Sequence, residues 1–419
     1  MAENTPLGFD TVCLHGGHTP ESNRAHLTPI YASSTYTFDS AQQAIDVFKG
    51  DEKGYIYGRW GNPTISEAEE KIALLEAYGL KDAKGDPLQL KAILHASGMA
   101  AICTMLLGNL KAGQKILTHY SLYGGMHELA EKILPGLGID AVIIDFHDIN
   151  KVEDAIKADD AIGLMYIETP ANPTLQCLDL EILCSLGKTY GLTVCVDNTF
   201  ATPYLQQPFK YDVDYVMHST TKFLNGHGTA VGGIVVGKDI DKMNAGMTKM
   251  HRLLGGNSNA FDAFLLTNGL RTFSLRMERH CSNAMQVAQF LEKHEAVAHV
   301  NYLGLDSHPD AAIAKKQMKH PGAMLSFELK GGFDAGVQFI DKLKICTNAV
   351  SLGTCDTLIS HPASSTHMSV AREQRLKFGI TDGLIRMSVG IENVEDIIND
   401  LEQAMEISQT PNSELFGAP

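Results

Sequence analysis

The chain has 419 residues, of which 44% are hydrophobic and 20% charged, an ordinary balance for a globular protein of two or three domains. The formal net charge of −15 argues against nucleic acid or an anionic membrane as the main partner. The eight cysteines form no CxxC pair, and we find no secretory signal and no apolar run of membrane-spanning length. We therefore expect a cytoplasmic protein with reduced thiols.

The N-terminal stretch, residues 1–62, is rich in Thr, Ser, Tyr and Gly and has weak periodicity, so we expect an extended arm. Residues 65–79 then show helical periodicity. Short apolar runs that are typical of buried strands follow, at 91–96, 114–119, 140–145, 161–168, 193–198, 214–219 and 232–237. Helical segments such as 179–191 lie between several of them, which predicts an α/β domain over 63–258: a mostly parallel sheet with helices on both faces.

The pattern of apolar and polar residues changes again after about residue 258. We expect a long helix at about 262–294, antiparallel strand pairing that involves 322–331, and a last helix at 395–408. These elements predict a smaller α+β domain over 259–419.

Ligand sites of open parallel sheets gather at the carboxyl ends of the strands, so the residues that follow each run are the candidates. Ser97, Gly98 and Met99 follow one run and would open a helix, where exposed amides can bind phosphate, although a serine there also serves simply as a cap. Asp197 ends another run and equally fits a turn or cap residue.

The segment HSTTKFLNGHG (218–228) places Ser219, Thr221 and Lys222 after a further run. Taken alone, Lys222 fits a surface lysine better than a functional one. Taken together, a phosphate-binding loop, a carboxylate and an amine at one sheet edge are the groups that pyridoxal phosphate requires. The lysine would form a Schiff base, and the carboxylate would keep the pyridine nitrogen protonated.

The remaining candidates favour structural roles. His15 and His18 lack further ligands at metal spacing, so we expect no metal site. Cys103 and Cys195 lie in apolar segments and fit core positions. No GxGxxG motif occurs where a dinucleotide fold would need it.

The chain resembles the cysteine/methionine-metabolism family of pyridoxal-phosphate enzymes. This family includes cystathionine γ-lyase and γ-synthase, methionine γ-lyase and the O-acylhomoserine sulfhydrylases. The resemblance runs nearly end to end. It rests on YGRWGNPT (57–64), ASGMAA (96–101), LYGG (122–125), YIETPANPT (166–174), DNTFATPY (197–204), HSTTKFLNGHG (218–228) and GLIRMSVGIE (383–392).

The resemblance implies fold type I and a role for each matching residue. Lys222 would be the Schiff-base lysine and proton carrier, Asp197 the partner of the pyridine nitrogen, and Tyr123 the residue that stacks on the ring and assists proton transfer. The phosphate would be bound by Ser97, Gly98, Met99, Ser219 and Thr221, and, from a neighbouring subunit, by Tyr57 and Arg59. Substrate would be held by Asn172, Ser351 and Arg386, with Arg386 on the α-carboxylate.

The resemblance further implies a homo-oligomer with shared active sites, usually a tetramer in this family, that acts on a small amino acid. The sequence GHG (226–228) and HPASSTH (361–367) are typical of methionine γ-lyases or sulfhydrylases. We therefore expect γ-elimination on methionine-type substrates to 2-oxobutanoate, ammonia and a thiol. The alternatives are a cystathionine γ-lyase or γ-synthase and an O-acetyl- or O-succinylhomoserine sulfhydrylase, because the same residues serve elimination and replacement. A binding protein that kept only the fold is the alternative of a different class.

Overall fold

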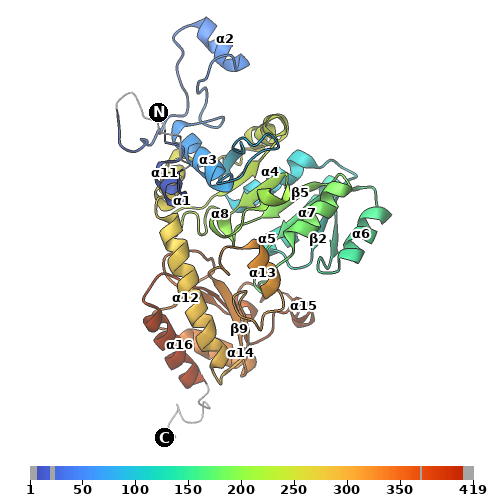
Figure 1. Cartoon of the computed structure of the whole chain (residues 1–419), viewed down its shortest axis with the longest axis vertical. Helices are drawn as coiled ribbons and strands as arrows, with labels where there is room; N and C mark the ends of the chain where they lie inside the picture. Colours follow the sequence, from blue (N-terminus) through green and yellow to red (C-terminus); the bar gives the residue numbers. More distant parts are fainter. Residues whose placement is uncertain (1–6, 19–23, 369, 409–419) are drawn as a thin grey trace.

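The structure is a computed structural model that describes residues 7–18, 24–368 and 370–408. Figure 1 shows two bodies joined by the long helix α12 (Phe273–Lys293), with the helix α2 (Ala41–Lys49) standing away from both. One body contains a seven-stranded sheet and the other a five-stranded sheet. No helix among the described residues is both long and apolar enough to cross a membrane.

The larger sheet has the strand order β1-β7-β6-β5-β4-β2-β3. Its strands are β1 (Lys91–His95), β2 (Lys115–His119), β3 (Asp140–Ile144), β4 (Ile162–Glu168), β5 (Thr193–Asp197), β6 (Tyr215–His218) and β7 (Gly233–Gly237). All pairings are parallel except the two that involve β7. All seven predicted strands are confirmed. Six of them are apolar runs that are mostly buried on both faces of the sheet, whereas the edge strand β3 is only partly buried.

Two hydrophobic clusters cover the two faces of this sheet, and alternate strand residues divide between them. Val196 and Val216 belong to one cluster, whereas Cys195 and Met217 belong to the other. The helices of this body are α3 (Pro63–Glu76), α4 (Gly98–Asn109), α5 (Gly124–Glu128), α6 (Ile149–Ala158), α7 (Leu180–Thr189), α8 (Thr202–Leu205), α9 (Ile240–Lys242) and α10 (Lys249–Leu254). The mostly parallel α/β architecture predicted from the sequence is therefore confirmed.

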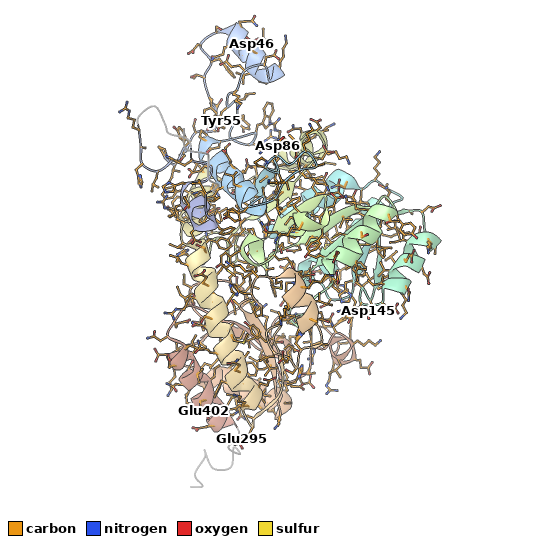
Figure 2. All side chains as sticks on the ribbon, in the orientation of Figure 1. Asp46, Tyr55, Asp86, Asp145, Glu295 and Glu402 are labelled. Atoms are coloured by element: carbon orange, nitrogen blue, oxygen red, sulfur yellow. The ribbon has the colours of Figure 1, made fainter. Side chains whose placement is uncertain are left out.

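The smaller sheet has the order β10-β11-β12-β9-β8 and is antiparallel except between β10 and β11. Its strands are β8 (Val297–Asn301), β9 (Met324–Leu329), β10 (Thr347–Asn348), β11 (Leu358–Ser360) and β12 (Leu384–Ser388). It packs with α13 (Ala311–Gln317), α14 (Gly332–Lys342), α15 (Arg372–Lys377) and α16 (Val394–Ser408). Figure 2 shows Glu295 and Glu402 at its far end.

The prediction of a single long helix at about 262–294 is wrong in one respect. The chain forms two helices there, α11 (Ala260–Leu270) and α12. A side chain at Gly269 would lie 2.1 Å from the carbonyl oxygen of Asn225, so this turn packs directly on the segment that follows Lys222. Arg276 donates to the carbonyl of Gly269 (2.8 Å), which also accepts from the amide of Thr272 (3.3 Å) at the end of α11. The interruption therefore fits α11 against the loop that carries the candidate lysine.

The N-terminal region also differs from the extended arm predicted for it. Helix α1 (Phe9–His15) packs on the larger body, where Phe9 lies edge-on to the rings of Tyr78 and Tyr204 and Cys13 is buried. Helix α2 forms at the tip of a segment that stands away from both bodies, where Figure 2 labels Asp46. We call this part of the chain, which includes Phe48, Tyr57, Arg59 and Trp60, the projecting segment. Residues 1–6 and 19–23 of the predicted arm lie outside the described residues.

Candidate active site

A cavity of about 1030 Å³ lies at the carboxyl ends of β4, β5 and β6 and is closed by residues of the smaller body. It is as large as the upper range of small-molecule sites, which leaves room for a cofactor and a substrate together. The predicted site residues that line it are Ser97, Gly98, Met99, Tyr123, Asn172, Asp197, Ser219, Thr221, Lys222, Ser351 and Arg386. Residues that are far apart in sequence are therefore brought to one place.

The start of helix α4 forms one end of the cavity. Ser97 caps this helix by accepting a hydrogen bond from the amide of Ala100 (3.1 Å), while the first amides of a helix have no partner within it. A side chain at Gly98 would lie 3.0 Å from Cβ of Ser219, and one at Gly233 would lie 2.3 Å from the carbonyl oxygen of Ser97. Only glycine allows this close approach, so the loop fits an anion such as phosphate.

Thr221 has a different structural environment from Ser219. Its hydroxyl donates to the carbonyl of Gly232 (3.2 Å) and accepts from the amide of Gly232 (2.9 Å). It thereby ties the segment after β6 to the residue that precedes β7. The amide of Ser219 donates to the hydroxyl of Thr199 (2.9 Å), which fixes the same loop from its other side.

Lys222 lies inside the cavity without a carboxylate partner. Its Nζ donates to the hydroxyl of Ser351 (2.8 Å), and no ion pair involves it within the described part of the chain. Burial, and to a smaller extent the charge of Arg386, lowers the pKa of Lys222 to about 8. Its neutral, proton-accepting form is therefore accessible near neutral pH.

Arg386, on β12, is a buried cation that has only neutral partners. It is 8% exposed, its Nη2 donates to the carbonyl of Ser351 (2.7 Å), and its Nη1 donates to Oδ1 of Asn172 (3.4 Å). Its Nε is buried without a partner, and burial lowers its pKa to about 10. A guanidinium in this state fits a carboxylate that arrives with a substrate.

Ser351 connects these two cations through its hydroxyl and its carbonyl. Its backbone has φ 111°, a conformation that costs energy for a residue with a side chain. The strain is maintained at the point where Lys222 and Arg386 converge. Strained backbone of this kind is common at functional sites.

Asp197, at the end of β5, accepts hydrogen bonds from the amide of Thr199 (3.0 Å) and from the hydroxyl of Tyr166 (3.2 Å). Burial raises the pKa of Asp197, so this carboxyl favours a partner that brings a proton or a positive charge. A protonated pyridine nitrogen is such a partner. Together with the phosphate-fitting loop and Lys222, the residues present fit pyridoxal phosphate.

Glu168, at the end of β4, also lines the cavity and is absent from the residues predicted on sequence. Its carboxylate accepts from the amide of Tyr123 (2.7 Å) and from the amide of Asn172 (3.3 Å). Burial, and then the nearby charge of Asp197, raises the pKa of Glu168. The signal that could have found it is its position at the carboxyl end of a parallel strand, which it shares with Asp197.

Tyr123 precedes helix α5 and is 46% exposed at the cavity surface. Two other predicted residues do not line the cavity of their own chain. Arg59 lies over the ring of Tyr57, with its Cζ 5.5 Å from the ring centroid, and its Nη1 donates to the carbonyl of Arg252. Both belong to the projecting segment.

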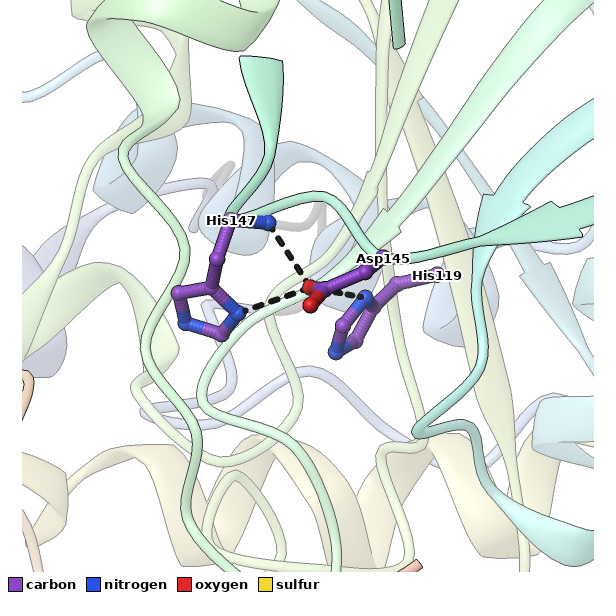
Figure 3. Close-up of side chains that lie close together, drawn as sticks. All are labelled: His119, Asp145 and His147. Atoms are coloured by element: carbon purple, nitrogen blue, oxygen red, sulfur yellow. Dashed lines mark hydrogen bonds and ion pairs between the residues drawn. The ribbon is translucent and has the colours of Figure 1, made fainter. Parts of the chain in front are cut away.

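His119, Asp145 and His147 place ligand-type atoms within 4.8 Å of one another near the ends of β2 and β3 (Figure 3). Hydrogen bonds account for the positions of these side chains. The amide of Phe146 donates to Nδ1 of His119 (3.0 Å), so Nε2 carries the proton and donates to Oε1 of Gln176 (2.7 Å). In this arrangement His119 has no free lone pair for a metal ion.

The relatives of this chain agree with the site geometry described above. Residues 10–406 match the family of Cys/Met metabolism PLP-dependent enzymes, and the chain belongs to that family. It is a pyridoxal-phosphate-dependent enzyme of fold type I.

Among curated relatives, the L-methionine gamma-lyase of Fusobacterium nucleatum subsp. polymorphum is 45% identical, over 96% of this chain and 99% of that protein. The cystathionine beta-lyase of Coxiella burnetii is 39% identical, with coverage of 96% and 99%. Among solved structures, cystathionine gamma synthase from Xanthomonas oryzae pv. oryzae is similar with a TM-score of 0.88 and 35% identity, over 97% of this chain and 99% of that one. The resemblance seen in the sequence motifs is confirmed.

Proposed function

We propose that this enzyme eliminates the γ-substituent of sulfur amino acids, as methionine γ-lyases do, and releases 2-oxobutanoate, ammonia and a thiol. The observation that carries the proposal is the pair of Lys222 and Arg386, two cations without carboxylate partners that meet at Ser351 in one cavity. An α-amino acid supplies a carboxylate for Arg386 while its amino group lies toward Lys222. The 45% identity to an L-methionine gamma-lyase supports methionine as the substrate.

The residues that would hold the cofactor follow from the chemistry of their surroundings. The amides of Gly98 and Met99 and the hydroxyl of Ser219 would bind its phosphate, with Ser97 shaping the loop. Thr221 would join them by turning its hydroxyl proton from the carbonyl of Gly232 to the phosphate. Asp197 would keep a proton on the ring nitrogen, and Tyr123 would lie against the ring face. Asn172 and Ser351 would orient both cofactor and substrate.

Pyridoxal phosphate, when bound, supplies an electron sink for the negative charge that forms next to the substrate amino group. Lys222, with its pKa lowered to about 8, would accept the proton from Cα and return it at a later stage. Arg386 would hold the α-carboxylate and so fix which Cα bond faces Lys222. Tyr123 would donate a proton to the sulfur that leaves from Cγ.

A γ-replacement enzyme is the second candidate. Such an enzyme would attach a thiol to Cγ in place of the leaving group, and this reaction would need the same residues. In cystathionine enzymes an arginine is expected where this chain has Glu128. Here Glu128 lines the cavity and forms an ion pair with Lys132 (2.8 Å), so this position offers no free cation to a second carboxylate. This observation favours substrates without a distal charge.

A substrate panel tests the proposal. Purified enzyme with pyridoxal phosphate is given methionine, homocysteine, cystathionine, cysteine, or O-acetyl- or O-succinylhomoserine with sulfide. The products are assayed as 2-oxoacid, thiol and thioether. We expect the highest kcat/KM for methionine or homocysteine with release of 2-oxobutanoate. Thioether formation from the O-acylhomoserines at a higher kcat/KM would instead identify a sulfhydrylase.

We further propose an organisation into an arm (1–62), a cofactor-binding domain (63–258) and a C-terminal domain (259–419), in a cytoplasmic homotetramer built from dimers with shared sites. Free thiols at all eight cysteines support the location. The projecting segment supports the shared sites, since Tyr57 and Arg59 lie outside the cavity of their own chain. In a dimer they would reach the phosphate of the neighbouring subunit.

A further inference from the structure

Three aromatic side chains line one part of the cavity wall and come from both bodies of the protein. Tyr120 follows β2, His127 belongs to α5, and Phe378 follows α15. The rings of Phe378 and Tyr120 are 6.0 Å apart and nearly parallel (18°). The rings of Phe378 and His127 are 6.2 Å apart and meet edge to face (72°). We call these three residues the aromatic clamp.

A chain of hydrogen bonds holds the Tyr120 ring in place. Its hydroxyl accepts from Nε2 of Gln176 (3.1 Å), and Oε1 of Gln176 accepts from Nε2 of His119 (2.7 Å). His119 is itself fixed by the amide of Phe146 (3.0 Å), and its ring lies 4.0 Å from that of Tyr120. His119, which Figure 3 shows beside Asp145 and His147, therefore supports the Tyr120 ring of the cavity wall.

The cationic side chains that line the cavity beside the clamp have carboxylate partners within the chain. Glu128 pairs with Lys132 (2.8 Å) and Arg375 pairs with Asp382 (2.8 Å), while Glu131 lies 3.3 Å from the imidazole of His127. Lys222 and Arg386, by contrast, have no carboxylate partner among the described residues. The cavity thus combines a cationic end with an aromatic wall whose neighbouring lysine and arginine are already paired.

We propose that the aromatic clamp binds the sulfur end of the substrate and selects an uncharged thioether over an alkyl chain of the same length. The proposal rests on the proposed function, because it takes Lys222 and Arg386 to hold the amino and carboxyl groups. A thioether makes favourable contacts at about 5 Å from an aromatic ring, which a methylene group does not make to the same extent. Phe378 is the member of the clamp that the C-terminal domain contributes.

The test uses two ligands that cannot turn over, α-methylmethionine and α-methylnorleucine, because neither has a proton at Cα. Their dissociation constants are measured by calorimetry on the enzyme with bound pyridoxal phosphate. We expect the wild type to prefer the thioether by about 3- to 10-fold, the size of a sulfur–aromatic contact. Phe378→Leu keeps an apolar side chain without a ring, and we expect it to bind both ligands equally.

Tyr120→Leu provides a second variant. Leu376→Ala is the matched control, because Leu376 is an exposed residue of helix α15, two positions before Phe378, and does not line the cavity. The control should keep the wild-type preference. A wild type that binds both ligands equally, or a preference that persists in both clamp variants, overturns the clamp. The two proposals can fail separately. If the preference for the thioether is lost in the variants but the wild type releases no thiol from methionine, the clamp is supported and the proposed reaction is overturned.

Discussion

Ser351 sets the spacing of the two cations on which the proposed chemistry depends. Its hydroxyl accepts a hydrogen bond from Nζ of Lys222 (2.8 Å), and its carbonyl accepts one from Nη2 of Arg386 (2.7 Å). Its own backbone is strained. Arg386 is buried and Lys222 is half-buried beside it, so each cation destabilises the other in the free enzyme. A substrate carboxylate relieves this repulsion, and binding energy is thereby concentrated at the reacting carbon.

Replacing Lys222 by alanine should remove the group that moves the Cα proton. We expect Lys222→Ala to lower kcat with methionine by more than about a thousandfold, since proton transfer and covalent attachment are lost together. Borohydride reduction should link the cofactor covalently to the wild type and not to the variant. Lys242→Ala is the control, because the Lys242 side chain is 71% exposed and remote from the cavity. Turnover of the Lys222 variant at the wild-type rate would refute the assignment.

Glu168→Gln tests the buried acid that holds Tyr123 and Asn172. A glutamine amide cannot accept from both backbone amides, so one hydrogen bond is lost and kcat/KM should fall about 5- to 10-fold. The raised pKa of Glu168, about 8, keeps its carboxyl largely protonated at the pH where Asp197 titrates, so this neutral substitution should leave the pKa of Asp197 unchanged. The acidic limb of the kcat/KM profile should therefore stay at its wild-type pH. A limb that moves to lower pH would show that Glu168 carries a negative charge there.

These residues show what the sequence can predict about the site. Lys222, Asp197 and Arg386 stand in distinctive motifs, and the structure brings them into one cavity. Glu168 stands in the motif YIETPANPT, where the residue pattern alone does not distinguish it as a site residue. Its role depends on two backbone amides that only the fold brings near it. Phe378 has no local signal at all, since its ring partners lie more than two hundred residues earlier in the chain.

At the scale of elements, the loop after β3 and the start of α13 are joined by His147. Its Nδ1 lies 3.2 Å from Asp145 and its Nε2 lies 3.4 Å from Asp310. The hydrogen bond to Asp310 chiefly, helped by Asp145, raises the pKa of His147. The contact therefore links the two bodies of the protein through a residue that titrates near neutral pH.

This contact should make stability depend on pH. The pKa is raised on folding, so the stabilisation is complete below the ordinary value of 6.5 and is lost as pH rises through the higher folded value. His147→Gln should lower the free energy of unfolding at about pH 6 by less than about 1 kcal/mol, because the side chain is 32% exposed, and should have no effect at about pH 9. Urea titrations across this range provide the measurement. A deficit of constant size at every pH would show that charge is not involved.

The elements that sequence patterns predict best are those buried in the large sheet, since a continuous apolar run leaves few alternatives. The break between α11 and α12 lies where Gly269 packs against Asn225, a contact between distant residues that no local pattern reveals. Helix α2 does have local helix signals, a Ser40 cap at its start and Gly50 at its end. It has no buried residue, however, and it stands in a segment of weak overall periodicity, which predicts an extended arm.

At the scale of the whole molecule, the projecting segment is the part with the fewest contacts to the two bodies. It exposes Phe48 (59%), Tyr57 (43%) and Trp60 (37%), and Figure 1 shows α2 separated from both bodies. Exposed aromatic residues on a segment without a core of its own fit the homo-oligomer that we propose, in which another subunit would cover them. This agrees with the proposal that Arg59 completes the site of a neighbour.

Mixing an Arg59 variant with a Lys222 variant tests shared sites directly. Arg59→Ala should weaken cofactor retention, and Lys222→Ala should abolish turnover. After subunit exchange, a mixed dimer should contain one site with both native residues. We expect up to about a quarter of the wild-type activity per chain if exchange is random. Exchange shown by mass spectrometry of labelled subunits, without any return of activity, would mean that Arg59 serves its own chain.

The place of β7 in the sheet has a consequence for how the protein is made. Strand β1 pairs only with β7, yet the ribosome synthesises β2 to β6 between them. The loop at Ser97 and Gly98 therefore lacks its neighbour Gly233 until the nascent chain has passed β7, a delay on the order of ten seconds at usual elongation rates. Chains stalled before Gly233 emerges should not capture pyridoxal phosphate, whereas chains stalled well beyond Gly237 should begin to do so. The phosphate-fitting loop is thus completed only after Lys222 itself has been synthesised.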